Sequence, residues 1–315
     1  MPPKKNPSLP TWIDHFLDAN PPRTKSLVMT LFGDVITPHG GQVWLGSLIE
    51  LLAAFGIGDR MVRTSVFRLA EEGWLDAERE GRRSRYTLDP RSAARFKRAY
   101  QRIYMPGERH WDGRWTLVFP TAGGITAEQR TGLRRELQWQ GFAMIAPFVF
   151  AHPAPDPATL EDILQRIDAQ DGVFVCSANE GSVVSGCPLV QLIDQYWNLD
   201  TVVQEYERFL ADFAAVPALL GAGAAQVLPR QAFVVRTLMI HAFRRVNLQD
   251  AQLPLNLLPA DWPGNTAYKL CRQIYRSTHE GAEQYILDTL RKEDTSAPPA
   301  ADYFYSRFGG IDKEA

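Results

Sequence analysis

The stretch DRMVRTSVFRLAEE, residues 59–72, decides how the first part of the chain folds. We expect an α-helix here, with Asp59 as its N-cap and Gly73 as its end. At about 100 degrees per residue, its apolar side holds Val62, Ser65, Val66 and Leu69. The opposite side holds Arg60, Arg63, Thr64, Phe67, Arg68 and Glu71.

The free side of this helix suits the major groove of double-stranded DNA. Arginine can bond guanine edges with two hydrogen bonds or hold phosphates, and threonine can reach either. A charge-rich outer helix face is more often only solvated, so this helix alone leaves that alternative open.

The neighbouring segments favour DNA binding. Apolar spacing predicts one helix at 25–32 and another at 43–55, which Gly56 and Gly58 end. After the third helix, residues 74–88 alternate, turn at Glu80-Gly81-Arg82 and alternate back, as a hairpin does. Four arginines gather near its tip: Arg79, Arg82, Arg83 and Arg85. Three helices and a basic hairpin predict a winged helix-turn-helix, with the hairpin along the phosphate backbone.

The distribution of charge along the chain also favours DNA binding. The chain has 315 residues and a formal net charge of -2. Residues 60–100 nevertheless carry eleven Lys or Arg against six Asp or Glu, a net charge of +5. One basic segment in an acidic protein indicates a single surface for a polyanion.

The rest of the chain predicts an α+β protein. Strands at 114–119, 142–150 and 173–177 alternate with helices at 127–139 and 158–169, in the β-α-β-β-α-β order of a ferredoxin-like unit. Helices follow at 190–213, 216–226, 229–247, 265–278 and 280–292. The expected organisation is a flexible leader (1–22), a winged helix-turn-helix domain (23–90), a linking helix (91–110), a ferredoxin-like central domain (111–188), a helical C-terminal domain (189–293) and a flexible tail (294–315).

Composition argues against secretion, membrane insertion and metal binding. No signal peptide and no run of about 18 apolar residues is present, which predicts a cytoplasmic protein. Cys176, Cys187 and Cys271 lack the spacing of a disulfide framework or a zinc site, so we expect ordinary buried thiols and no metal.

Several motifs resemble the PaaX family of transcriptional repressors. In the N-terminal part they are Lys25-Ser26-Leu27, Leu31-Phe32-Gly33-Asp34, Gly41-Gln42-Val43-Trp44-Leu45-Gly46, Arg63-Thr64-Ser65-Val66-Phe67-Arg68-Leu69, Gly73-Trp74-Leu75 and Arg85-Tyr86. In the C-terminal part they are Arg236-Thr237-Leu238-Met239-Ile240-His241, Phe243-Arg244-Arg245, Leu253-Pro254, Leu258-Pro259 and Asp261-Trp262-Pro263-Gly264.

The resemblance implies a homodimeric repressor of phenylacetic acid catabolism genes that phenylacetyl-CoA releases from DNA. A pocket for this effector needs cations at its mouth and apolar residues within. The C-terminal region offers Arg236, His241, Arg244, Arg245 and Trp262. The alternative for these five residues is that they hold helices together or form the dimer contact.

Two other functions remain as rivals. One is a regulator that answers a different acyl-CoA or acts as an activator. The other is a metal-dependent nuclease, because the central unit resembles the ferredoxin-like CRISPR-associated endonucleases. Those enzymes place an aspartate at the end of the first strand, whereas here Leu117-Val118-Phe119 runs into Pro120. We therefore expect no enzyme activity and no cofactor.

Overall fold

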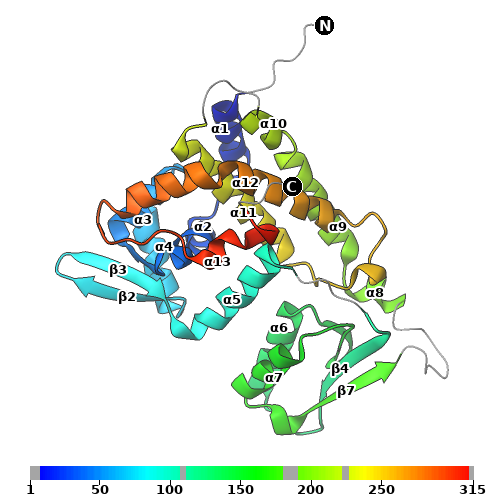
Figure 1. Cartoon of the computed structure of the whole chain (residues 1–315). Helices are drawn as coiled ribbons and strands as arrows, with labels where there is room; N and C mark the ends of the chain where they lie inside the picture. The colour runs from blue at the N-terminus through cyan, green and yellow to red at the C-terminus, as the bar shows by residue number, and fades with distance from the viewer. Residues whose placement is uncertain (1–7, 107–110, 180–190, 222–226, 312–315) are drawn as a thin grey trace, which may run out of the picture. The chain divides into compact units, whose positions relative to one another are not determined.

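A computed structural model describes residues 8–106, 111–179, 191–221 and 227–311 (Figure 1). The chain divides into two compact units, each built from separate stretches. The first unit comprises Met1–Pro106, Arg208–Arg244 and Thr266–Ala315, and the second comprises Gly107–Glu207 and Arg245–Asn265. The predicted helical domain at 189–293 is therefore not one compact unit, because its helices pack with two different parts of the chain.

The first unit begins with helices and a small sheet. In chain order these are α1 (Leu9–Ala19), α2 (Thr24–Leu31), the π-helix η1 (Phe32–Ile36), the 3-10 helix η2 (Thr37–His39), β1 (Gln42–Trp44), α3 (Leu45–Ala53), α4 (Asp59–Glu71), β2 (Leu75–Glu80), β3 (Arg83–Leu88) and α5 (Pro90–Tyr104). Leu27, Leu48, Leu52, Val62 and Leu69 from α2, α3 and α4 are all completely buried. The predicted apolar stripes thus form one core.

Two boundaries differ from the prediction. Residues 42–44 are a strand rather than the start of a helix, because Val43 pairs with Tyr86 and Trp44 with Arg85 across the sheet. Gly58, not Asp59, is the N-cap of α4, and Asp59 is its first residue. There Asp59 forms an ion pair with Arg63 one turn later.

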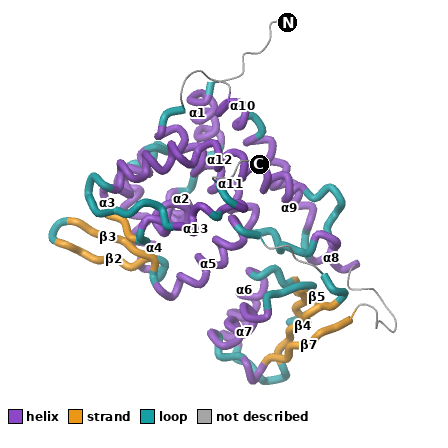
Figure 2. Tube along the Cα trace, viewed as in Figure 1, coloured by secondary structure: helices purple, strands orange, loops and turns teal. Residues whose placement is uncertain are grey.

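The predicted hairpin is confirmed and belongs to a three-stranded antiparallel sheet. Strand β3 lies between β1 and β2. Since Glu80 pairs with Arg83, only Gly81 and Arg82 form the turn, and Gly81 has the positive φ of 60° that glycine adopts without strain. In Figure 2 the hairpin projects beyond the helices of its unit.

The prediction of a flexible leader is wrong for the described part of residues 1–22. Residues 9–19 form α1, whose Leu9, Ile13 and Phe16 are buried. The Phe16 ring lies 5.0 Å from the ring of Phe213 in α9 (Leu199–Phe213). Apolar contacts therefore hold this segment against the unit.

The prediction of a flexible tail at 294–315 is also wrong for the described residues. The segment contains α13 (Asp302–Tyr305) and the 3-10 helix η7 (Arg307–Gly309). Phe304, Arg307, Phe308 and Ile311 are all buried. The tail is thus part of the core of its unit.

The remaining helices differ from the prediction in where they are divided. They are α8 (Leu192–Tyr196), α9, α10 (Val216–Gly221), α11 (Pro229–Asn247) and α12 (Pro263–Leu290). Asn198, with a φ of 48°, separates α8 from α9 where one helix was expected. The predicted helix 216–226 is described only to residue 221, and 222–226 lie outside the described residues.

Helix α12 is continuous where two helices were expected. Gly281 lies inside this helix, and a Cβ at this position would lie only 3.1 Å from that of Ala232 in α11. The glycine therefore serves the close approach of two helices.

The second unit contains the predicted β-α-β-β-α-β order. Its elements are β4 (Arg114–Pro120), α6 (Ala127–Trp139), β5 (Ala143–Ala146), β6 (Val149–His152), α7 (Pro157–Arg166) and β7 (Val173–Asn179), and short 3-10 helices lie at η3 (Gln170–Gly172) and η6 (Leu255–Leu257). The antiparallel sheet has the order β5-β6-β4-β7. Val118, Leu133, Leu137, Phe150 and Leu160 contribute to its core.

The described residues contain neither a membrane-spanning helix nor a metal-binding group. Within them, no helix combines the length and the apolar character needed to cross a membrane. No group of three or more His, Cys, Asp or Glu side chains among the same residues could hold a metal ion. Cys271 is buried as expected, Cys176 is half-buried, and Cys187 lies outside the described residues.

Replacing Phe16 with alanine tests whether α1 is docked. We expect Phe16→Ala to lower the free energy of unfolding by about 3 kcal/mol, because a buried ring leaves a cavity. The exposed neighbour His15 supplies the control His15→Ala, which should change stability by less than about 0.5 kcal/mol. Urea unfolding measures both, and equal effects would show that α1 does not pack against the unit.

Candidate nucleic-acid interface

The outer face of α4 carries the predicted DNA-contacting side chains. Val62, Ser65, Val66 and Leu69 are buried, which fixes the rotation of the helix about its axis. The exposed residues are Arg60, Met61, Arg63, Thr64, Phe67, Arg68 and Glu71. Phe67 is 63% exposed, which is unusual for a large apolar side chain on a folded surface. A face of this kind is suited to a partner with both charge and apolar surface.

The arginines of α4 differ in their contacts. Arg63 Nε lies 2.5 Å from Asp59 Oδ1, and both side chains are more than half exposed. Arg60 and Arg68 form no ion pair with any carboxylate of the described residues. Thr64 donates to the backbone oxygen of Arg60 at 2.9 Å. An exposed ion pair such as that of Arg63 with Asp59 contributes little to stability, so an anion could replace the carboxylate. Arg60 and Arg68 are exposed and equally accessible to an anion.

The hairpin divides its four arginines between two faces. Arg82 lies in the turn and is exposed, and Arg79 is exposed on β2. Arg83 and Arg85 share a face of β3 with Trp44, over whose ring their guanidinium carbons lie at 4.5 and 5.6 Å. Arg82 and Arg79 are thus the freer cations, whereas Arg83 and Arg85 have an aromatic partner.

Arg85 also bonds across the hairpin. Its Nη2 lies 2.5 Å from Glu78 Oε2. The hydrogen bond to Glu78 and the charge of that carboxylate raise the pKa of Arg85. The pairing with Glu78 thus favours the charged form of Arg85.

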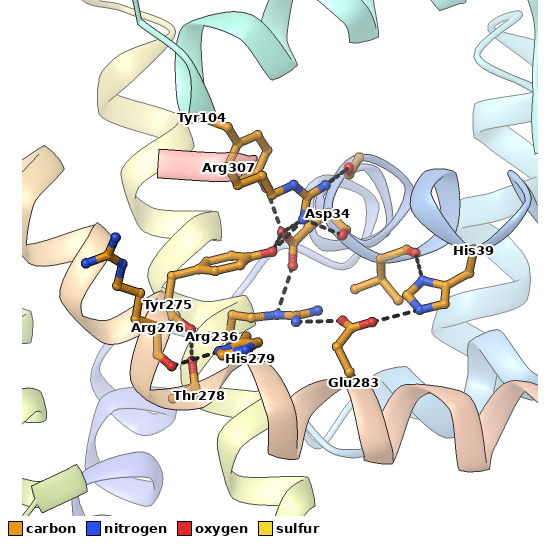
Figure 3. Close-up of polar contacts among 12 residues, drawn as sticks. Asp34, His39, Tyr104, Arg236, Tyr275, Arg276, Thr278, His279, Glu283 and Arg307 are labelled. Atoms are coloured by element: carbon orange, nitrogen blue, oxygen red, sulfur yellow. Dashed lines mark hydrogen bonds and ion pairs between the residues drawn. The ribbon is translucent and has the colours of Figure 1, made fainter. Parts of the chain in front are cut away.

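Behind the interface, Asp34 is the centre of a buried cluster of charged groups (Figure 3). Its Oδ1 accepts hydrogen bonds from Tyr104 at 2.7 Å, Tyr275 at 2.9 Å and Arg307 at 2.9 Å. Its Oδ2 lies 3.3 Å from Nε of Arg236. The side chains of Asp34, Arg236 and Arg307 have no exposed surface.

The cluster continues through Glu283. Arg236 Nη1 lies 2.8 Å from Glu283 Oε1, and His39 Nε2 lies 2.9 Å from Glu283 Oε2. Burial alone raises the pKa of Glu283, but the charge of Arg236 and the hydrogen bond from His39 overcome it and hold that pKa at about 2. Asp34 and His39 lie between α2 and α3, so the cluster attaches the helices behind α4 to α11 and α12.

Most of this cluster was not predicted from the sequence. Asp34 stood out only within a family motif, and His39, Glu283 and Arg307 were not candidate site residues. The one available signal was a charged residue, Asp34, between the apolar residues 31–32 and 35–36. A charge in such a position is rarely buried unless it is paired.

The five predicted effector residues do not share one environment. Arg236 is completely buried within the charged cluster, and His241 Nδ1 lies 2.9 Å from Thr30 Oγ1 in α2. Both contacts fit the alternative that these residues hold helices together. Arg244 belongs to the first unit and is half-buried. Arg245 and Trp262 belong to the second unit, where Arg245 is exposed and Trp262 is buried.

Glu283→Gln tests the energetic role of the cluster. We expect it to lower the free energy of unfolding by about 3 kcal/mol at pH 7, because it leaves the buried charge of Arg236 under-compensated. The exposed Glu280 on the same helix supplies the control Glu280→Gln, with almost no effect.

The same pair of variants gives a pH dependence. The pKa of Glu283 lies below its usual value of 4.5, so its ionised form stabilises the folded state above about pH 4.5 and this contribution is lost as the pH falls towards 2. The stability difference between wild type and Glu283→Gln should therefore shrink between pH 5 and pH 3. A difference that stays constant over this range in urea unfolding would contradict the ion pairing.

The chain is similar to known proteins over nearly its full length. The profile of the PaaX-like protein matches residues 23–92, that of the PaaX protein central Cas2-like domain matches 108–186, and that of the PaaX-like protein C-terminal domain matches 197–288. The chain is 35% identical over 306 residues to the transcriptional repressor PaaX of Escherichia coli (strain K12), which covers 97% of this chain and 96% of that protein.

Among solved structures, the chain is similar to the uncharacterized protein Rv0674 from Mycobacterium tuberculosis. The two are 27% identical, with a TM-score of 0.47, and the similarity covers 75% of this chain and 88% of that one. The prediction of a regulator rather than an enzyme is confirmed by the relative in Escherichia coli, which is a repressor. The three matching profiles and the identity over nearly the full length show that this chain belongs to the PaaX family of transcriptional repressors.

Proposed function

We propose that the chain represses phenylacetic acid catabolism genes by binding their operators as a homodimer, and that phenylacetyl-CoA releases it. The observation that carries this proposal is the outer face of α4, which presents three exposed arginines together with the exposed ring of Phe67. The relative in Escherichia coli is a repressor of the same family. A cytoplasmic location remains a prediction.

In this proposal, α3 and α4 act as a helix-turn-helix and the hairpin β2–β3 acts as its wing. Helix α4 enters the major groove with Arg60, Arg63, Thr64, Phe67 and Arg68 towards the bases. The wing contacts phosphates through its arginines, chiefly Arg79 and Arg82, which have no aromatic partner among the described residues. In a two-fold symmetric dimer the two copies of α4 read half-sites about one helical turn apart.

For the effector, we propose that Arg244 binds a phosphate of the acyl-CoA. Its Nε is buried without a hydrogen-bond partner, and among the described residues no carboxylate pairs with it. Burial lowers the pKa of Arg244, so an anion that compensates its charge would be strongly favoured. Arg245 and Trp262 remain candidates, while Arg236 and His241 already contact other residues.

Arg68→Ala and Arg82→Ala separate base reading from phosphate contact. Arg68→Ala should cost about 1 to 3 kcal/mol of binding free energy and relax the preference for the operator, because it removes a base contact. Arg82→Ala should weaken operator and random duplexes alike and reduce the salt dependence of binding. Fluorescence anisotropy on both duplexes measures this, and identical effects of the two variants would refute the division of roles.

Effector release is tested by adding phenylacetyl-CoA to the preformed complex, with phenylacetate and acetyl-CoA as controls. Only phenylacetyl-CoA should release the DNA. Arg244→Gln should raise the concentration needed for release by about tenfold, the effect of one lost charge-assisted hydrogen bond, while DNA affinity stays unchanged. The exposed Lys269 supplies the control Lys269→Gln.

Other results of these experiments would each change one part of the proposal. Release by a different acyl-CoA would identify that compound as the effector and leave the proposed repressor function unchanged. Release that Arg244→Gln leaves unchanged would remove Arg244 from the effector site. Transcription that rises when the protein binds would make it an activator instead.

A further inference from the structure

The carboxylate of Glu293 lies at the N-terminus of α3. Its Oε2 accepts hydrogen bonds from the backbone nitrogen of Ser47 at 2.5 Å and from Ser47 Oγ at 3.0 Å. The N-cap residue of α3, Trp44, provides no side-chain cap. Unpaired N–H groups and the helix dipole make this end of a helix attractive to anions. Glu293 is the anion that occupies it in this structure.

The approach of this carboxylate depends on Gly46. A Cβ at that position would lie 2.6 Å from Oε2 of Glu293, too close for any side chain to be accommodated without displacing the carboxylate. Gly46 is not among the glycines with a positive φ. The space it leaves, rather than its backbone conformation, is what the contact uses.

The same acidic segment faces the hairpin. Arg83, whose guanidinium lies over Trp44, donates from Nη1 to the backbone oxygen of Glu293 at 3.4 Å. Asp294 is one of the carboxylates that raise the pKa of Arg85, after the larger effect of Glu78. Glu293 and Asp294 therefore lie against both the N-terminus of α3 and the arginines of the proposed wing.

The segment that follows is held in place. Ala297 is buried, and the backbone nitrogen of Ala301 donates to the oxygen of Pro38 at 3.0 Å. Further on, Arg307 is fixed in the charged cluster around Asp34. The position of Glu293 is thus set by the fold on both sides, by α12 before it and by the docked tail after it.

We propose that Glu293, assisted by Asp294, is an internal counter-anion that competes with DNA phosphate for the N-terminus of α3 and the wing arginines. This inference rests on the proposed function. In the free protein the contact is autoinhibitory, and a backbone phosphate displaces the carboxylate when DNA binds. Because phosphates carry no sequence information, the contact lowers affinity for every duplex alike.

Glu293→Gln tests this with a matched control. Glutamine can still accept from Ser47 and removes only the charge. Glu50→Gln removes the same charge from α3 itself, at an exposed pair with Lys292. Both variants and the wild type are titrated by fluorescence anisotropy against a duplex from upstream of the chain's own gene and against a random duplex of equal length, over a series of salt concentrations.

Glu293→Gln should bind both duplexes about fivefold more tightly than the wild type, the effect of removing one competing negative charge. Its plot of log affinity against log salt should be steeper by about one unit, because one more phosphate is neutralised. Glu50→Gln should tighten binding by less than about twofold. Asp294→Asn, which leaves the contact with Ser47 intact, should tighten binding to an intermediate extent.

Thermal unfolding of each variant checks that the fold is retained, and Asp294→Asn carries the test if Glu293→Gln is unstable. Binding by Glu293→Gln that is no tighter than binding by Glu50→Gln would overturn the inference and leave Glu293 as a helix cap only. If the wild type and all variants bind neither duplex, the proposed function fails, and this inference fails with it. Binding by the wild type with no gain in the variants contradicts this inference alone.

Discussion

The burial of one carboxylate, that of Asp34, constrains the whole of the first unit. Removing a charge from water costs several kcal/mol unless partners compensate it. The partners come from four different elements: Tyr104 from α5, Arg236 from α11, Tyr275 from α12 and Arg307 from the tail. Each of these elements must be in place for the charge to be compensated. A single residue between α2 and α3 therefore joins segments from almost the entire length of the chain.

This arrangement explains how a highly charged outer surface is compatible with a stable unit. The rotation of α4 is fixed from behind by an apolar stripe, which leaves its arginines on the exposed side of the helix. The two arginines that the fold does need, Arg236 and Arg307, are buried in the cluster. Cations that hold the structure and cations available to a partner are thus different residues. This separation supports our interpretation of α4 as the recognition surface of a repressor.

The sequence predicted those parts of the fold that depend on local patterns. The apolar period of α4, the alternation of the hairpin and the order of the second unit each occur within short segments. Helix α1 had a usable signal as well, because Leu9, Ile13 and Phe16 repeat at helical spacing. The charged cluster was not predictable in this way, since Asp34 and Arg307 are 273 residues apart. Arg236 was a candidate for the effector site, with helix packing or a dimer contact as the alternative, because arginine and histidine share its helix. Nothing local indicated that two carboxylates would lie beside it.

The most direct test of the account is hydroxyl-radical footprinting of side chains with and without the upstream duplex. Met61 and Phe67 are 56% and 63% exposed on α4 and should oxidise readily in the free protein, as should Leu255, 55% exposed in the second unit. The account predicts that DNA protects Phe67 and Met61 from oxidation and leaves Leu255 unchanged. Unaltered oxidation of Phe67 in a saturated complex would show that α4 is not the surface that binds DNA.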